Sequence, residues 1–318
     1  MSITNLDATC PDLGPIGDGD SARAADRPTF SDTREVPPAG RFNWAEFDEV
    51  LEPRLGWRAV DFGELYRHRD LLIYWTLRGL KARHAQSALG IAWAVIQPVV
   101  NTAIFTVVFG RLVGVSSDGA PYPLFALVGM VVWTFFANAL REGVESLTRY
   151  TNMLSKIYFP RLILPLSTVL GKLLDLAVGF LLVIPVMMWY RVVPRPEALV
   201  VLPLLMLMLV LAAIGLTFWL SALSVQFRDV SHALVFALQA MMYLSPVVFS
   251  DRIVPGRFRL LYGLNPVAGV ISGARAVLLG TGPLPWDLIV PGALSTAILA
   301  VSGLYYFRSR ERLFADVA

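Results

Sequence analysis

Long apolar segments constrain this sequence more than any other feature, because each can cross a lipid bilayer. A helix of about 20 apolar residues spans the roughly 30 Å of hydrocarbon. Such segments occur at 89–111, 124–140, 162–190, 199–226, 230–249 and 288–307. The regular alternation typical of membrane β-strands is absent from the sequence. We therefore expect an all-α, polytopic membrane protein with six transmembrane helices within residues 89–318.

The composition agrees with a membrane protein and argues against nucleic-acid binding. Apolar residues make up 56% of the chain and charged residues only 16%, against about 25% charged residues in soluble domains. The net charge is +3, but the Lys and Arg residues gather at the ends of apolar segments, where membrane topology places them. We expect membrane lipids as neighbours and no nucleic-acid partner.

The sequence before the first apolar segment has two parts. Residues 1–60 carry acidic side chains among Pro, Gly and Ser, which indicates a disordered tail. Residues 61–88 mix basic and apolar side chains, which is typical of an amphipathic helix lying in the membrane surface. A soluble docking helix is the alternative. Residues 1–40 lack the basic start and apolar stretch of a signal peptide, so the first transmembrane helix is expected to direct insertion.

Proline, glycine and arginine interrupt a weakly apolar stretch at 253–282. Irregular backbone at membrane depth must be covered by protein or water. We therefore expect this stretch to enter the membrane from one side and return. With six crossings, the basic residues divide as 13 on one side and 7 on the other, and the positive-inside rule places both termini in the cytoplasm.

The segment 141–161 between the second and third spans has apolar residues at helical spacing. Val144, Leu147, Tyr150, Leu154 and Ile157 recur every three or four residues. This pattern predicts a short helix with one apolar stripe. The stripe is suited either to a groove on a partner protein or to a helix that simply connects two spans at the interface, and periodicity does not separate the two.

Three longer strings resemble a known family. They are RHAQSALGIAWAVIQPVVNTAIFTVVFGRLVGV, YPLFALVGMVVWTFFANAL and NMLSKIYFPRLILPLSTVL. The chain is similar from about Leu65 to Leu313 to the permease subunit of type-2 ABC exporters of polysaccharides. The elements QSALGIAW, IQP, VVFGRL and KIYFPRLILP stand in the family's order and spacing.

The resemblance implies a half-transporter in the inner (plasma) membrane. Two copies of this chain are expected to pair with two copies of a separate ATPase and to export a lipid-linked glycan such as an O-antigen, capsule, teichoic acid or galactan. It also implies short re-entrant gate helices on the outer side before the last span. The loop at 141–161 corresponds to the family's coupling helix, with these ATPase-contacting candidates: Val144, Leu147, Tyr150, Asn152, Leu154 and Lys156.

The energy for transport is expected to come from another polypeptide. The chain has no GxxxxGK[ST] phosphate loop, since its only GK pair is Gly171 and Lys172 inside an apolar segment. We expect no cofactor on this chain, with ATP and Mg²⁺ bound by the partner. Lys172 and Asp175 stand three residues apart and are read as a structural pair, although an ion-driven carrier with a proton relay is the competing interpretation.

Aromatic and polar residues within the spans are the candidates for a glycan path, because aromatic faces stack on sugar rings and amides exchange hydrogen bonds. Most aromatics are expected at membrane interfaces in any case. Polar side chains are costly against lipid, so those inside spans should face a partner helix or a water-filled path. The candidates are Trp93, Gln97, Asn101, Trp133, Gln239 and Tyr243.

Other functions remain open at this stage. A type-2 ABC permease that exports drugs or other amphiphiles belongs to the same superfamily. A membrane-embedded glycosyl or acyl transferase would need acidic or histidine residues clustered at a membrane face, and such groups are scarce. A structural membrane protein without transport activity is the last alternative. No spacing of metal ligands occurs, so neither a metal site nor a catalytic role is predicted.

Overall fold

In the computed structural model, residues 62–84, 92–150, 160–227 and 229–311 can be described, and all lie in one compact unit, Arg54–Ala318. Within these ranges the regular structure is helical and no strand occurs. The predicted all-α fold is therefore confirmed. The acidic tail at 1–60 lies outside the described residues.

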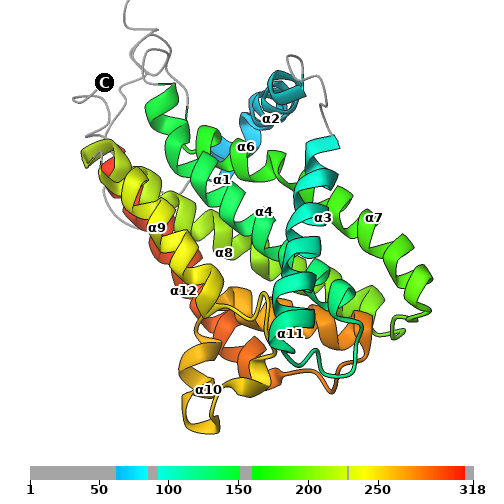
Figure 1. Ribbon diagram of the computed structural model, residues 1–318. Coiled ribbons are helices and arrows are strands. Elements are labelled where there is room, and N and C mark those ends of the chain that lie inside the picture. Colours follow the sequence, from blue (N-terminus) through cyan, green and yellow to red (C-terminus); the bar gives the residue numbers. More distant parts are fainter. Residues whose placement is uncertain (1–61, 85–91, 151–159, 228, 312–318) are drawn as a thin grey trace, which may run out of the picture. The chain divides into compact units, whose positions relative to one another are not determined.

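The helices are labelled in their order along the chain in Figure 1. Their bounds are α1 Phe62–Arg67, α2 Arg69–His84, α3 Trp93–Phe105, the π-helix η4 Thr106–Val113, α4 Tyr122–Arg149, α6 Ile163–Gly171, α7 Leu173–Tyr190, α8 Ala198–Gln226, α9 Asp229–Leu244, the 3-10 helix η5 Asp251–Ile253, α10 Gly256–Gly263, α11 Pro266–Leu279 and α12 Trp286–Arg310.

Five stretches among the described residues are long and apolar enough to cross a membrane. They are Val95–Val113, Tyr122–Arg149, Ile163–Tyr190, Ala198–Gln226 and Trp286–Arg310. The expected span at 230–249 is represented by α9, which has 16 residues and is therefore about 24 Å long. A helix of that length falls short of the hydrocarbon thickness, so a sixth crossing stays a prediction.

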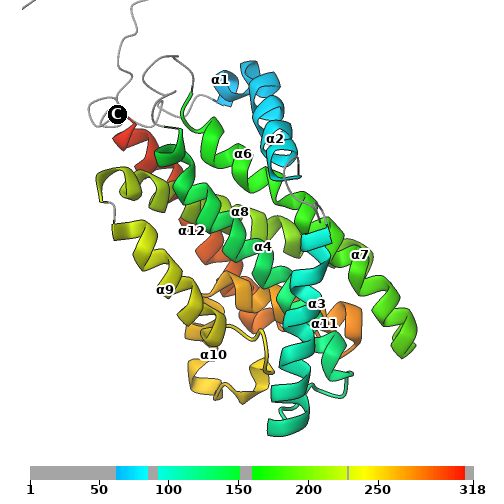
Figure 2. The same cartoon turned by 45° about the horizontal axis from the view of Figure 1, so that its top comes forward.

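Helix α4 forms the centre of the unit, with α3 and α9 on either side of it in both views (Figures 1 and 2). Eighteen of its 28 residues are buried. Phe125, Phe135, Phe136 and Leu140 are among the largest fully buried side chains. α3 is the opposite case, because only 11% of the residues in the most apolar part of Val95–Val113 are buried. α4 and α3 thus have similar hydropathy but different surroundings. α4 is mostly surrounded by protein, whereas most of α3 lies on the surface of the chain.

Helices α8 and α12 pack at unusually close range. A Cβ added at Gly303 would overlap the carbonyl oxygen of Gly215, and one added at Gly215 would lie 2.6–2.7 Å from the backbone of Leu299 and Ala300. Small residues at helix crossings let two backbones approach, which is how helices associate in lipid without a hydrophobic driving force. These two glycines therefore set the distance between α8 and α12.

The interrupted stretch at 253–282 forms α10 and α11. Asn265 caps α11 by accepting a hydrogen bond from the Val267 N–H, Pro266 occupies the first turn, and Gly280 ends the helix with φ of +67°. Residues 266–278 of α11 are all buried. α10, in contrast, leaves Phe258, Leu260 and Leu261 exposed, so protein covers only the α11 part of this stretch, and its entry and return through the membrane stays a prediction.

The helix predicted at 61–88 is observed in part. α1 and α2 are separated at His68, and α2 contacts α6 through Trp75, which is 4% exposed. Its other face leaves Ile73, Tyr74 and Leu77 exposed. α1 and α2 lie at the same end of the unit as the ends of α4 and α12, away from α10 and α11 (Figures 1 and 2).

Candidate functional site

One face of α4 stays open and carries polar side chains. Thr134, Asn138, Arg141 and Glu145 recur at three or four residue spacing and are partly or fully exposed, while the other faces of this helix are buried. Arg141 donates a weak 3.5 Å hydrogen bond to Asn138 Oδ1. We call these four residues the α4 polar stripe. The predicted path residues do not include this stripe, although its spacing of three or four residues was a readable signal.

The helices beside α4 expose most of the predicted path residues. On α3, Gln97 is exposed, Asn101 is partly exposed and Trp93 is 54% exposed. On α9, Gln239 is exposed and Tyr243 is 55% exposed. Each set stands at four-residue spacing and therefore shares one helix face. Amides exposed on apolar helices need polar partners or water in a membrane. Within the described part of the chain, Gln97 and Gln239 remain exposed.

The structure corrects the prediction that Trp133 lines the glycan path. Its side chain is 5% exposed and belongs to the core around α4, with its ring 6.0 Å from that of Phe136. Trp133 lies on a different face of α4 from the partly exposed Asn138. Trp133 therefore packs the core and lines no open surface.

The apolar stripe of the predicted coupling helix also needs correction. Residues 141–149 are the last turns of α4, and Val144 and Leu147 are at most 1% exposed because they pack inside the chain. Tyr150 is half-buried, with its ring 5.0 Å from that of Trp75. These side chains hold α4 against its neighbours. Asn152, Leu154 and Lys156 lie outside the described residues, so their role stays a prediction.

The polar side of the same turns remains accessible. Thr148 and Arg149 are exposed, and Arg149 pairs with Glu145 at 3.0 Å. A surface pair of this kind contributes little to stability. The exposed face near the end of α4 is therefore polar, opposite to the apolar stripe that periodicity emphasised.

Lys172 lies at the break between α6 and α7 and is buried. Its Nζ is 2.5 Å from Glu142 Oε1 on α4 and 3.4 Å from Asp175 Oδ2. The sequence predicted the pair with Asp175, and Glu142 is the partner that it missed. Since a buried charge is tolerated only with partners, the cluster joins α4 to the start of α7.

A second buried cation fastens the opposite end of α4. Arg275 on α11 is 2% exposed and donates to the carbonyls of Phe125, Pro246, Val247 and Phe249 at 2.6–3.3 Å. Its guanidinium carbon lies 3.4 Å from the centre of the Phe125 ring. This residue thus connects α11, the first turn of α4 and the turn after α9.

Two partly exposed ion pairs of one arginine lie at that end of the unit. Arg259 on α10 contacts Asp287 at the start of α12 and lies 3.0 Å from Asp251 in η5. The hydrogen bond to Asp287 raises the pKa of Arg259. A raised pKa means that this cation stabilises the fold at all pH values below its ordinary pKa, and that the contribution is lost only at higher pH.

Comparisons with known proteins cover most of the chain. A model of the ABC-2 type transporter family matches residues 71–279. The chain is 26% identical over 248 residues to the O-antigen export system permease protein RfbA of Klebsiella pneumoniae, covering 78% of this chain and 95% of that protein. It is 28% identical to the protein of that name in Myxococcus xanthus, covering 80% and 97%.

A polysialic acid transport protein matches as well. Over 252 residues the chain is 22% identical to the polysialic acid transport protein KpsM of Escherichia coli, covering 74% of this chain and 91% of that protein. The family match includes α4, both buried cations and the exposed faces of α3 and α9. On these grounds the chain belongs to the ABC-2 type transporter family.

Proposed function

We propose that this chain is the membrane-spanning permease subunit of an ATP-driven exporter of a lipid-linked polysaccharide. The similarity to permeases for O-antigen and polysialic acid, which extends over nearly their full length, carries this proposal. The chain moves the glycan from the cytoplasmic to the outer side of the inner membrane. A separate ATPase subunit binds ATP and Mg²⁺ and supplies the energy.

Two copies of this chain and two ATPase subunits form the transporter. The open amides on α3 and α9 support a second copy or a water-filled path, because lipid would leave them without hydrogen bonds. The α4 polar stripe lies on the helix between them. A glycan passing along these faces meets amides, hydroxyls and the rings of Trp93 and Tyr243, a surface that binds sugars weakly and repeatedly.

The ATPase contacts the chain at the end of α4, with both termini on the same cytoplasmic side. Residues 151–159 continue directly from α4, so closure of the ATPase dimer would move this helix first. Export of drugs by the same architecture is the alternative. It predicts stimulation by small amphiphiles in place of glycans.

The test is ATP hydrolysis by this chain co-expressed with its ATPase in lipid discs, with and without lipid-linked glycan. We expect a stable complex whose hydrolysis rises with glycan. Gln97→Leu and Gln239→Leu should reduce glycan stimulation with the complex preserved, while Val290→Leu, an exposed site on α12, should not. Stimulation by amphiphiles alone would assign the chain to drug export, and absence of any complex would refute the proposal.

A further inference from the structure

Two aromatic rings are stacked where α8 and α12 meet, close to the end of α12. The rings of Trp219 and Tyr306 are nearly parallel, with an interplanar angle of 7° and centroids 4.2 Å apart. The Trp219 indole N–H donates to Ser302 Oγ at 3.1 Å, which fixes the orientation of that ring. The guanidinium carbon of Arg310 lies 5.7 Å from the centre of the Tyr306 ring. Tyr306 and Arg310 stand four residues apart and therefore share one face of α12.

The polar groups of this Trp219–Tyr306–Arg310 cluster have hydrogen-bonding capacity left. Arg310 is exposed and Tyr306 is partly exposed. Within the part of the chain that the structure describes, no carboxyl group pairs with Arg310 and the Tyr306 hydroxyl makes no hydrogen bond. Glu311, the next residue along the chain, pairs instead with Arg308 at 2.8 Å. The guanidinium N–H groups and the phenolic O–H thus form a set of donors beside a positive charge.

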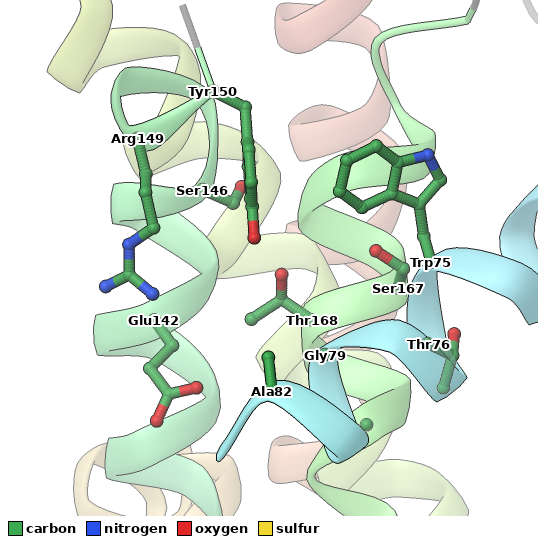
Figure 3. Close-up of a pocket in the computed structure, with 11 residues that line it drawn as sticks. Trp75, Thr76, Gly79, Ala82, Glu142, Ser146, Arg149, Tyr150, Ser167 and Thr168 are labelled. Atoms are coloured by element: carbon green, nitrogen blue, oxygen red, sulfur yellow. The ribbon is translucent and has the colours of Figure 1, made fainter. Parts of the chain in front are cut away.

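The cavity between α2, α4 and α6, at the same end of the unit, lacks this selectivity (Figure 3). Its volume is about 230 Å³, and both Glu142 and Arg149 line it together with several hydroxyl groups. Such a mixed lining favours neither an anion nor a cation. The cluster on α12 presents a cation and a hydroxyl donor side by side, so it favours an anionic group with several oxygens.

The position of the cluster along α12 gives its depth in a membrane. Trp286–Arg310 is one of the stretches able to span, and Trp286 at its beginning is 59% exposed, as is typical of a tryptophan at the membrane interface. Tyr306 follows twenty residues later, about 30 Å along the helix axis. This distance matches the thickness of the hydrocarbon. Tyr306 therefore lies at the opposite interface, and Arg310, one turn further, lies at the depth of the lipid phosphate groups.

The adjoining face of α12 is suited to acyl chains. Leu294, Ile298 and Val301 are each more than half exposed, and they lie between the two interfaces that Trp286 and Tyr306 mark. An amphiphile with an anionic head can contact this apolar face and the cluster at the same time. A soluble anion would contact the cluster alone, so the surroundings favour a lipid.

We propose that the Trp219–Tyr306–Arg310 cluster binds the phosphate group of a phospholipid in the leaflet at the C-terminal end of α12. Arg310 pairs with the phosphate oxygens, and the Tyr306 hydroxyl donates to one of them. Trp219 holds the Tyr306 ring in place by stacking, and the acyl chains lie along the exposed face of α12. The bound lipid fixes the depth of α12 beside its close contact with α8.

The test compares two lipids with identical acyl chains, only one of which carries a phosphate. The full chain is purified and titrated with phosphatidylglycerol or with diacylglycerol, and bound lipid is counted by native mass spectrometry. We expect the first phosphatidylglycerol to bind about tenfold more tightly than the first diacylglycerol, the size of one charge-assisted hydrogen bond. Equal affinity for the two lipids would overturn the proposal.

Two variants locate this preference. Arg310→Gln removes the charge from an exposed position and should abolish the preference. Tyr306→Phe keeps the stacking on Trp219, removes only the hydroxyl, and should reduce the preference a few-fold. Arg257→Gln, at an exposed arginine on α10, and Tyr305→Phe, at the neighbouring tyrosine, are the controls and should leave it unchanged. A preference that survives Arg310→Gln, or that is lost equally in the controls, would exclude this cluster.

A soluble competitor separates a lipid site from a site for a free phosphate compound. Glycerol 3-phosphate carries the same phosphate group without acyl chains and should compete only weakly, because it lacks the contact with the apolar face of α12. Displacement of the lipid at the concentration at which the lipid itself binds would show a site for a soluble phosphate and would refute the lipid assignment. None of these measurements uses transport, so their outcome is independent of the proposed function.

Discussion

Replacement of Arg275 by methionine tests whether a buried cation holds α11, α4 and the turn after α9 together. The change keeps an unbranched side chain of similar length and removes the four hydrogen bonds that Arg275 donates to the carbonyls of Phe125, Pro246, Val247 and Phe249. Each hydrogen bond lost from such a buried charged group costs about 1–3 kcal/mol. Relief of the desolvated guanidinium offsets part of this sum, and we expect a net loss of about 3–5 kcal/mol.

The loss is measured locally by cysteine labelling. The natural chain has one cysteine, Cys10, so Val248→Cys in a Cys10→Ser background reports on the turn after α9 alone. Val248 is 3% exposed and should react only when this turn opens. A local loss of 3 kcal/mol raises the labelling rate about a hundredfold.

Two further variants interpret the result. Arg257→Met removes an exposed arginine of α10 and should leave labelling unchanged. Arg275→Lys retains the charge, but one ammonium cannot reach four carbonyls in the arginine's arrangement, so an intermediate rate is expected. If Arg275→Met labels like the parent and melts at the same temperature, the four hydrogen bonds do not fasten this end.

Three other changes give direct predictions. Gly303→Ala should lower the melting temperature in lipid discs, because its Cβ overlaps the backbone of α8, and an unchanged value would show that the two helices separate freely. Lys172→Met removes the buried amine that Glu142 and Asp175 share, and because both carboxyl groups are about one-fifth exposed it should destabilise by less than the roughly 3–5 kcal/mol of a fully buried pair; adding Glu142→Gln should recover part of this loss in the same melting assay. Arg259→Gln should cost about 1 kcal/mol or less, since its ion pairs are partly exposed, and chemical denaturation at low and high salt should show the difference shrinking with salt.

Hydropathy predicted most of the membrane-spanning helices, and the ends of two of them agree closely. The segments predicted at 199–226 and 288–307 correspond to α8 Ala198–Gln226 and α12 Trp286–Arg310. The agreement has a physical basis, because lipid cannot satisfy backbone groups and therefore requires an uninterrupted helix of fixed length. The interruption at Lys172 was not predicted, since it depends on Glu142 from another helix.

Hydropathy did not predict which helices are surrounded by protein. Lipid tails and leucine side chains are equally apolar, so the sequence of α4 does not reveal that its neighbours are helices. For this reason Trp133, Val144 and Leu147 were assigned to functional surfaces although they pack the core. The α4 polar stripe was the better signal, because a polar side chain in a transmembrane helix needs a polar partner or water whether protein or lipid surrounds it.

The two buried cations explain how one apolar helix keeps a single position among others. Apolar helix surfaces in lipid can pack in several registers at similar free energy, since moving from protein to lipid costs them little. Arg275 requires the carbonyl of Phe125 at the beginning of α4, and Lys172 requires Glu142 nearer its end. A slip of α4 along its axis would break the hydrogen bond from Arg275 to Phe125 and the ion pair of Lys172 with Glu142, and the loss of these two contacts favours the observed position.

The contacts of Arg275 and Lys172 with α4 also determine how α4 can move when the ATPase acts on its last turn. α4 has 28 residues and is therefore about 42 Å long, with the ATPase expected at one end and α11 fastened at the other. α4 is a continuous helix, so it transmits a displacement applied at residues 151–159 to its first turn. That turn is bound to α11 through Arg275. We infer that α4 and α11 move as one body during transport. A cross-link between these two helices near Phe125 and Arg275 should therefore leave glycan-stimulated hydrolysis intact, and inhibition by this cross-link would show that they separate in each cycle.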